Sequence, residues 1–317
     1  MDEVSISLVL LVKPRDSSVS SDRGKYPGQN RLRFPIEKAR GVGKMGCRVI
    51  MSTDRSSPLP HGDANAMSAN RNLDRFLEQW PYEPGSVKVR IVSGDDGREV
   101  LQMRVDMGIL QLEIDGRPDG ERPHGFESYY DYLVSEELRD EDFVLNEDQC
   151  VEVDREFVQF YHRRVCWLTL REFQRAVEDA DHTLSMMDLC SDHSPDEHWA
   201  ISHEQYRPFV LFHRIQAAAL DKLELRSPEV AVEELNKGLE QLRELFAEHD
   251  AEEQFDEDEL VVRLVQLRES LRSHYHVGRT LEERLEEAVA KEEYELAAQL
   301  RDELAQRRTR SRGSSMP

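Results

Sequence analysis

The feature that most constrains the fold is a change in the spacing of apolar residues along the chain. In residues 87–114 apolar and polar side chains alternate, which is the period of a strand with one buried face. From about Asp154 onward the apolar residues recur every three or four positions, which is the period of a helix. We therefore predict an α+β chain that is mostly α.

The alternating part divides into three strand segments. SVKVRIV is followed by the turn sequence SGDDGR, EVLQMRVDM ends before Gly108, and ILQLEI ends at a Gly- and Pro-rich stretch. We predict a small antiparallel β-meander, with the helix that covers one of its faces at residues 126–139. The expected inward residues are Val87, Val89 and Ile91, then Val100 or Leu101 with Met103 and Val105, then Ile109 or Leu110 with Leu112 and Ile114.

The helical part predicts an array of helices, after a short helix within residues 70–79. We place the array helices near residues 154–169, 171–190, 199–225, 228–248 and 257–276. Small residues such as Ala176 and Ala231 suggest repeats of the tetratricopeptide (TPR) kind, although they lie 55 residues apart instead of the 34 of that repeat. A TPR-like array and a plain helical bundle both remain open.

Composition sets the remaining boundaries. We predict a disordered leader at 1–66, a small α+β meander domain at 67–145, the helical array at 150–278, a helical hairpin at 279–308 and a disordered basic tail at 309–317. Because the composition changes at Met67, that residue is a second candidate for the start of translation.

The charge is uneven and bears on the class of partner. The chain carries −22 overall, of which residues 1–66 hold +4 and the rest −26. An acidic body repels phosphate backbones, so we predict no direct nucleic-acid binding by it.

No apolar run is long enough to span a membrane, and the four cysteines form no CxxC pair, so we expect reduced thiols in a cytoplasmic protein.

Two clusters of polar residues qualify as candidate chemical sites. Cys190, His193, His198 and His203 have zinc-ligand chemistry, but their spacing matches no standard site, and a polar loop is the favoured interpretation. After the meander, His124 could act as a base beside an arginine that holds an anion. A contact for a ligand or peptide is a second interpretation, and a simple turn with ion pairs is the favoured one. That second cluster comprises Arg117, Asp119, Arg122, His124 and Glu127. We predict no metal and no cofactor.

Two short apolar stripes face each other near the C-terminus. Leu281, Leu285, Ala288 and Val289 precede the polar turn KEEYE, and Leu296, Ala297, Leu300 and Leu304 follow it. Helices of about two turns are marginal alone, so this hairpin should pair with another hairpin, in this chain or in a partner, as in a small four-helix bundle.

The hairpin sequence LEEAVAKEEYELAAQLRDEL closely resembles the UVR motif of excinuclease B and C subunits, of some Clp-type ATPases and of the activator of a bacterial arginine kinase. The resemblance implies protein–protein contact through paired hairpins. Outside the hairpin the chain lacks the GxxxxGK[ST] nucleotide motif and the paired CxxC zinc motifs of those proteins. The segment GILQLEIDGRPDGERPHGFES also resembles a planctomycete group of UVR-bearing proteins without an assigned function.

From the resemblance we predict a non-enzymatic adaptor that docks through its hairpin, with a link to excinuclease-type DNA repair. An adaptor of a Clp-type ATPase is the alternative, self-association is a further one, and an enzyme with a site at 117–127 is a distant third. Arg301 and Asp302 are expected to fix the register by charge pairing. The predicted partner-binding residues are Leu285, Ala288, Val289, Tyr294, Ala297, Ala298, Leu300, Arg301, Asp302 and Leu304.

Overall fold

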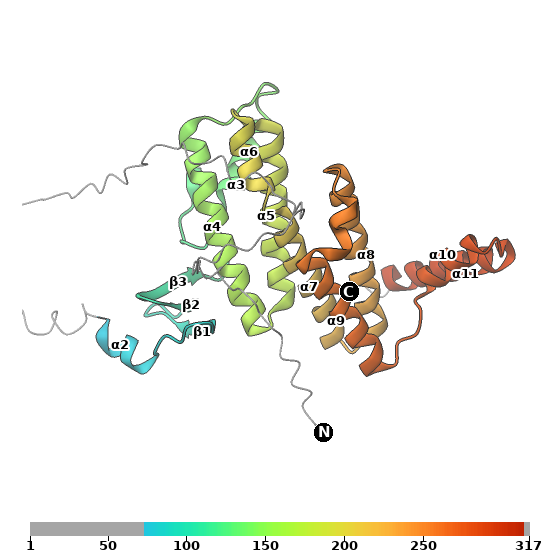
Figure 1. Cartoon of the computed structure of the whole chain (residues 1–317). Helices are drawn as coiled ribbons and strands as arrows, with labels where there is room; N and C mark the ends of the chain where they lie inside the picture. Colours follow the sequence, from blue (N-terminus) through green and yellow to red (C-terminus); the bar gives the residue numbers. More distant parts are fainter. Residues whose placement is uncertain (1–72, 314–317) are drawn as a thin grey trace, which may run out of the picture. The chain divides into compact units, whose positions relative to one another are not determined.

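The computed structural model describes residues 73–313, which divide into two compact units between Arg122 and Pro123 (Figure 1). The predicted leader, 1–66, lies outside the described residues. The secondary structure is a three-stranded antiparallel sheet followed by many helices, so the chain is α+β and mostly α, as predicted.

The first unit contains the predicted meander. Helix α2 (Asp74–Gln79) precedes β1 (Lys88–Ser93), β2 (Glu99–Val105) and β3 (Gly108–Glu113), which pair in the order β1-β2-β3. The register aligns Ile91 with Leu101 and Leu112, and Val89 with Met103 and Leu110. Of the alternatives left open by the sequence, Leu101 and Leu110 therefore belong to this apolar face.

An arginine joins the segment after α2 to the sheet. The buried Arg104 of β2 donates from Nε to the Trp80 carbonyl oxygen at 2.7 Å and from Nη1 to the Gly108 carbonyl oxygen at 2.9 Å. The Arg90 guanidinium lies over the Trp80 ring, 4.1 Å from its centroid. These contacts fix the Trp80 segment against the polar side of the meander.

The second unit is built from helices that pack mainly on their neighbours in sequence. The packed series is α4, α5, α7, α8 and α9, with α6 against α5 (Figure 1). Their bounds are α3 Tyr129–Glu137, α4 Glu147–Leu170, α5 Phe173–His193, α6 Glu197–Glu204, α7 Arg207–Glu224, α8 Pro228–Glu248 and α9 Glu259–Tyr275, with short 3₁₀ turns η1 Pro123–Gly125 and η2 Glu252–Glu257. The TPR likeness of this array stays a prediction.

Two predicted helix boundaries were wrong for identifiable reasons. The single helix predicted at 199–225 is interrupted between α6 and α7, because Pro208 lacks the N–H that would continue the α6 ladder and instead occupies the first turn of α7. Helix α4 begins at Glu147 and not near 154, because Asn146 and Gln149 form a reciprocal capping box.

Helix α3 is held on α4 by a buried carboxylate. Glu156 of α4 accepts hydrogen bonds from the Tyr129 N–H at 2.7 Å and the Tyr130 N–H at 3.1 Å, and its Oε1 lies 3.1 Å from His182 Nε2 of α5. The orphan N–H groups at a helix start favour an acceptor of negative charge. Within the second unit α3 packs on α4, and the expectation that this helix covers the sheet stays a prediction.

Two features of the array set how closely its helices approach. Gly238 of α8 faces α7, and a Cβ at that position would lie 2.3 Å from Ile215 Cγ2. Five helices, α4, α7, α8, α9 and α10 (Leu281–Ala290), are each followed by a non-glycine residue in the left-handed region, at Arg171, Arg226, Asp250, His276 and Glu292. Such residues reverse the chain in few positions and keep consecutive helices adjacent.

Within the described part of the chain, no helix combines the length and the apolar content that crossing a bilayer requires.

Candidate functional site

The candidate site is the C-terminal hairpin formed by α10 (Leu281–Ala290) and α11 (Tyr294–Gly313). Thr280 begins α10 with a capping box, in which its hydroxyl accepts from the Glu283 N–H and the Glu283 carboxylate accepts from the Thr280 N–H at 2.8 Å. Helix α11 runs to Gly313, so the helix continues into the segment predicted from 309 as a disordered tail.

The turn between the two helices is a Schellman motif. The Glu293 N–H bonds to the Ala288 carbonyl at 2.8 Å, and the Glu292 N–H bonds to the Val289 carbonyl at 3.0 Å. Glu292 adopts φ 59°, a left-handed conformation that favours glycine. The tight turn therefore places a glutamate, Glu292, in a backbone conformation that is strained for it.

The two helices bury a narrow apolar seam against each other. Leu281, Ala288, Ala297 and Leu300 are buried in it, with Leu285 and Leu304 partly buried at its edges. We call these six residues the hairpin seam. Half of the predicted partner-binding residues therefore pack inside the hairpin and not on its surface. These are Leu285, Ala288, Ala297, Leu300 and Leu304.

Three of the predicted residues lie outside the seam and are exposed. Val289 is 53% exposed, Tyr294 is 68% exposed, and Ala298 is also exposed. Val289 and Ala298 each follow a seam alanine by one residue, so they are rotated from the seam in the same sense on both helices. Because the helices run antiparallel, this rotation places them on the same side of the hairpin. We call Val289, Tyr294 and Ala298 the outer face.

The charged pair predicted to fix the register is also exposed. Arg301 Nη2 lies 3.0 Å from Asp302 Oδ1, so these adjacent residues pair with each other at the surface of α11. Arg279 precedes α10 and Lys291 follows it, and both bind Glu287 within the helix. These hydrogen bonds lower the pKa of Glu287 to about 2. The hairpin thus carries its own ion pairs in addition to its seam.

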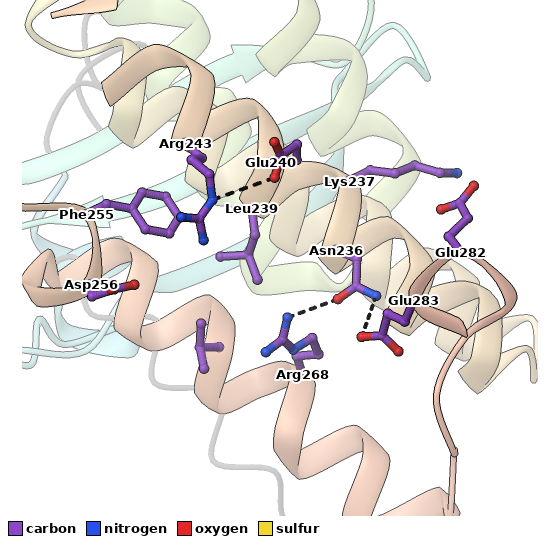
Figure 2. Close-up of a pocket in the computed structure, with 11 residues that line it drawn as sticks. Asn236, Lys237, Leu239, Glu240, Arg243, Phe255, Asp256, Arg268, Glu282 and Glu283 are labelled. Carbon is purple, nitrogen blue, oxygen red and sulfur yellow. Dashed lines mark hydrogen bonds and ion pairs between the residues drawn. The ribbon is translucent and has the colours of Figure 1, made fainter. Parts of the chain in front are cut away.

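The base of the hairpin is tied to the array through Glu283 (Figure 2). Its Oε1 accepts hydrogen bonds from Arg272 of α9 and, at 3.2 Å, from Asn236 Nδ2 of α8. Asn236 Oδ1 in turn accepts from Arg268 Nη1 at 3.0 Å. Burial alone would raise the pKa of Glu283, but the hydrogen bonds from Arg272 and the Thr280 N–H outweigh it and keep this pKa below its usual value.

A cavity of about 520 Å³ lies beside this junction, between α8, η2, α9 and α10 (Figure 2). Leu239 and Phe255 contribute apolar surface, and the Arg243 guanidinium lies 4.4 Å from the centroid of the Phe255 ring. Basic and acidic side chains alternate around the rest of the lining, so neither sign of charge dominates it. The charged lining residues are Lys237, Arg243, Arg268, Glu240, Asp256, Glu282 and Glu283.

The cluster after the meander is divided between the two compact units. Arg117 Nε lies 3.6 Å from Asp119 Oδ2 in the first unit, and the Gly120 N–H bonds to the Arg117 carbonyl at 2.9 Å, which is the predicted turn with an ion pair. In the second unit His124 stacks on Tyr132 with ring centroids 3.9 Å apart. Arg122 belongs to the first unit and Glu127 to the second.

The Cys/His cluster is dispersed among separate partners. Cys190 is buried, and His193 lies 3.1 Å from Glu137, whereas His203 Nε2 lies 2.9 Å from Asp154 and His198 is exposed beside Asp196. Within residues 73–313 no three metal-ligating side chains converge. Burial raises the pKa of both Cys166 and Cys190 to about 12, so neither is a reactive thiolate at neutral pH.

Sequence reasoning missed the residues that attach the hairpin to the array. The signal for Glu283 was present, because Thr280-x-x-Glu283 before an apolar stripe is a capping box. Asn236, Arg268 and Arg272 carried no comparable signal, since their role depends on the folded arrangement of α8 and α9.

The comparisons with known proteins bear on this hairpin alone. No curated protein and no solved structure matches the chain. One family model does match: residues 279–307, which span α10, the Schellman turn and most of α11, match the UvrB/uvrC motif, so the chain carries a UVR motif in this hairpin.

Proposed function

We propose that this protein is a non-enzymatic adaptor that docks through its α10–α11 hairpin onto a second hairpin of the same kind in a partner protein. The observation that carries the proposal is the UvrB/uvrC motif at 279–307, whose hairpin buries its seam yet leaves Val289 and Tyr294 exposed. Exposed apolar side chains on a small helical element favour burial against a partner. Pairing two hairpins would bury the outer face of each.

The proposed partner is an excinuclease subunit of DNA repair that carries such a hairpin. The chain has a net charge of −22, which disfavours direct contact with a phosphate backbone. A link to repair would therefore run through a protein partner and not through DNA itself.

A Clp-type ATPase is the second candidate partner, and one observation favours it. The hairpin is attached to an acidic array in which α4, α5, α7, α8 and α9 pack in sequence. An array of this kind offers a surface for a client protein, which an adaptor of an unfolding ATPase requires. The same hairpin would then deliver the client instead of recruiting a repair enzyme.

A binding experiment separates these partners. The full chain and a chain that ends at Arg279 are titrated with purified excinuclease subunit and, separately, with purified Clp-type ATPase, both from the same genome. We expect one partner to bind the full chain and not the shortened one. Equal binding by both chains contradicts docking through the hairpin, and sedimentation of the full chain alone reports self-association.

A point substitution tests the outer face. Ala298→Arg places a long charged side chain on the outer face without entering the seam, and we expect it to weaken partner binding by at least about tenfold. Gln299→Arg is the matched control, because it adds the same charge one residue along α11 at a position outside the predicted contact. Equal effects of the two substitutions would argue against this contact face.

A further inference from the structure

A second pocket lies between α4 and α7 and shares no residue with the hairpin. Its volume is about 460 Å³, within the range of pockets that hold small ligands. The lining is almost entirely aromatic and aliphatic, with one charged residue. It consists of Phe157, Val158, Tyr161, Arg164, Tyr206, Phe209 and Val210.

The charged residue is a deeply buried arginine whose hydrogen-bond acceptors are neutral. Arg164 is 1% exposed, donates from Nη1 to Thr183 Oγ1 at 2.9 Å and from Nε to His213 Nδ1 at 3.3 Å. Burial, with the adjacent Arg164 charge, lowers the pKa of His213 to about 3, so this imidazole is neutral and accepts at Nδ1. Burial lowers the pKa of Arg164 to about 10, which leaves it charged at pH 7.

The carboxylate that acts on Arg164 is already bound by another arginine. Asp179 attracts Arg164 at longer range, but its oxygens accept from Arg163 Nη2 at 2.7 Å and from Arg163 Nε at 3.0 Å. Asp179 is therefore bonded directly to Arg163 and acts on Arg164 only at longer range. A buried charge without a carboxylate of its own is costly, and such groups concentrate at binding sites.

We propose that this pocket binds a small apolar monocarboxylate, whose carboxylate pairs with Arg164 and whose alkyl or aromatic body lies among Phe157, Tyr161 and Phe209. The positive charge at depth selects an anion, and a planar guanidinium suits a carboxylate. An extended peptide fits less well. Beyond Arg164 the lining side chains offer its backbone amides two tyrosine hydroxyls, so most of those amides would be desolvated without partners.

The test uses octanoate and 4-phenylbutyrate as probes for calorimetric titration of the full chain. We expect both to bind, 1-octanol to bind at least about tenfold more weakly because it lacks the charge, and acetate to show no binding because it lacks the apolar body. Octanoate and 1-octanol binding equally, or no octanoate binding at millimolar concentration, would overturn the proposal.

Two exposed valines on α4 supply a matched pair of variants. Val158 lines the pocket and Val151 does not, and each is 55% exposed. Val158→Glu places a carboxylate at the pocket and should weaken octanoate binding at least about fivefold, whereas Val151→Glu should leave it unchanged. Equal effects would refute this location for the site.

A variant of the buried arginine tests the charge directly. Arg164→Met keeps a long side chain and should weaken octanoate at least about tenfold while leaving 1-octanol within about twofold. Arg155→Met, on the exposed side of α4, is its control. Loss of both probes from a folded Arg164→Met protein would refute pairing with the carboxylate, and if that variant does not fold, the two glutamate variants decide the outcome.

Discussion

Replacing Gly238 by alanine tests the close approach of α7 and α8, on which the position of the hairpin anchor depends. Gly238 lies two residues from Asn236, the α8 residue that bonds Glu283 at the base of the hairpin. A Cβ at position 238 would lie 2.3 Å, 2.4 Å and 2.8 Å from Cγ2, Cγ1 and Cδ1 of Ile215. Carbon atoms normally approach no closer than about 3.5 Å, so at least one helix or side chain must move by about 1 Å.

The size of the effect follows from two opposing contributions. Ile215 is 2% exposed, so it has little free space into which it can rotate. Overpacking of this kind costs about 1–3 kcal/mol, and the severe overlap favours the upper end. Alanine gains about 1 kcal/mol over glycine in a helix interior. We therefore expect a net loss of about 2 kcal/mol, or about 4–8 °C in melting temperature for a unit of this size.

Urea and thermal unfolding of the full chain, followed by circular dichroism at 222 nm, would measure this loss. Gly278→Ala is the control, because a Cβ there meets nothing within 4 Å. Ile215→Ala removes all three atoms that the new Cβ would meet, so the double variant should be more stable than the sum of the single losses predicts, by at least about 1 kcal/mol. A Gly238→Ala protein that melts at or above the wild-type temperature, or additive losses in the double variant, would refute the close approach.

The remaining predictions concern the hairpin. Glu292→Gly should stabilise the hairpin by about 1 kcal/mol, because glycine adopts the left-handed conformation at this turn without strain. Hydrogen exchange of the Ala297 and Leu300 amides should then be slower than in the wild type. Faster exchange would contradict the strain assigned to Glu292. Glu283→Gln should destabilise the second unit by about 1–2 kcal/mol at pH 7, through loss of its charge-assisted bond from Arg272, as measured by urea unfolding. Because folding lowers the pKa of Glu283, its contribution is complete above the unfolded pKa of about 4.3 and is lost as the pH falls through the lower folded value. The stability difference between wild type and Glu283→Gln should therefore stay constant from pH 7 to about pH 4.5 and shrink as the pH falls further, and a difference that does not shrink below about pH 4.5 would contradict the assignment.

Local sequence patterns predicted the elements whose boundaries are set locally. The alternation in 87–114 predicted the meander, and the helix predicted from residue 228 begins there as α8, with Pro228 in its first turn. The break between α6 and α7 was missed because the apolar period runs on through Pro208, although the proline itself carried the signal. The packing of α3 on α4 depends on Glu156, which is distant in sequence, so no local pattern predicted it.

The candidate site shows the same division between local and distant information. The helical spacing of apolar residues predicted the hairpin, but it placed Ala288 and Val289 in the same apolar stripe. Only the fold shows that the alanine is buried and the valine is exposed. The seam holds two alanines, Ala288 and Ala297, among four leucines, and periodicity alone does not separate these alanines from the exposed Ala298. Arg164 had no sequence signal at all, since an arginine in a helix is ordinarily exposed and its burial follows from the packing of α5 and α7 around it.

The anchor and the proposed docking face act on different ends of the hairpin, and this separation links stability to binding. Glu283 fixes the start of α10 to α8 and α9, whereas Val289 and Tyr294 lie at the turn, far along the hairpin from that anchor. A partner that docks at the outer face gains from a hairpin already held in place, because less conformational entropy is then lost on binding. Glu283→Gln should therefore weaken partner binding without touching the contact face, through faster dissociation of the complex. If that variant binds its partner with unchanged affinity, the hairpin docks as an independent element, and the array serves a role of its own.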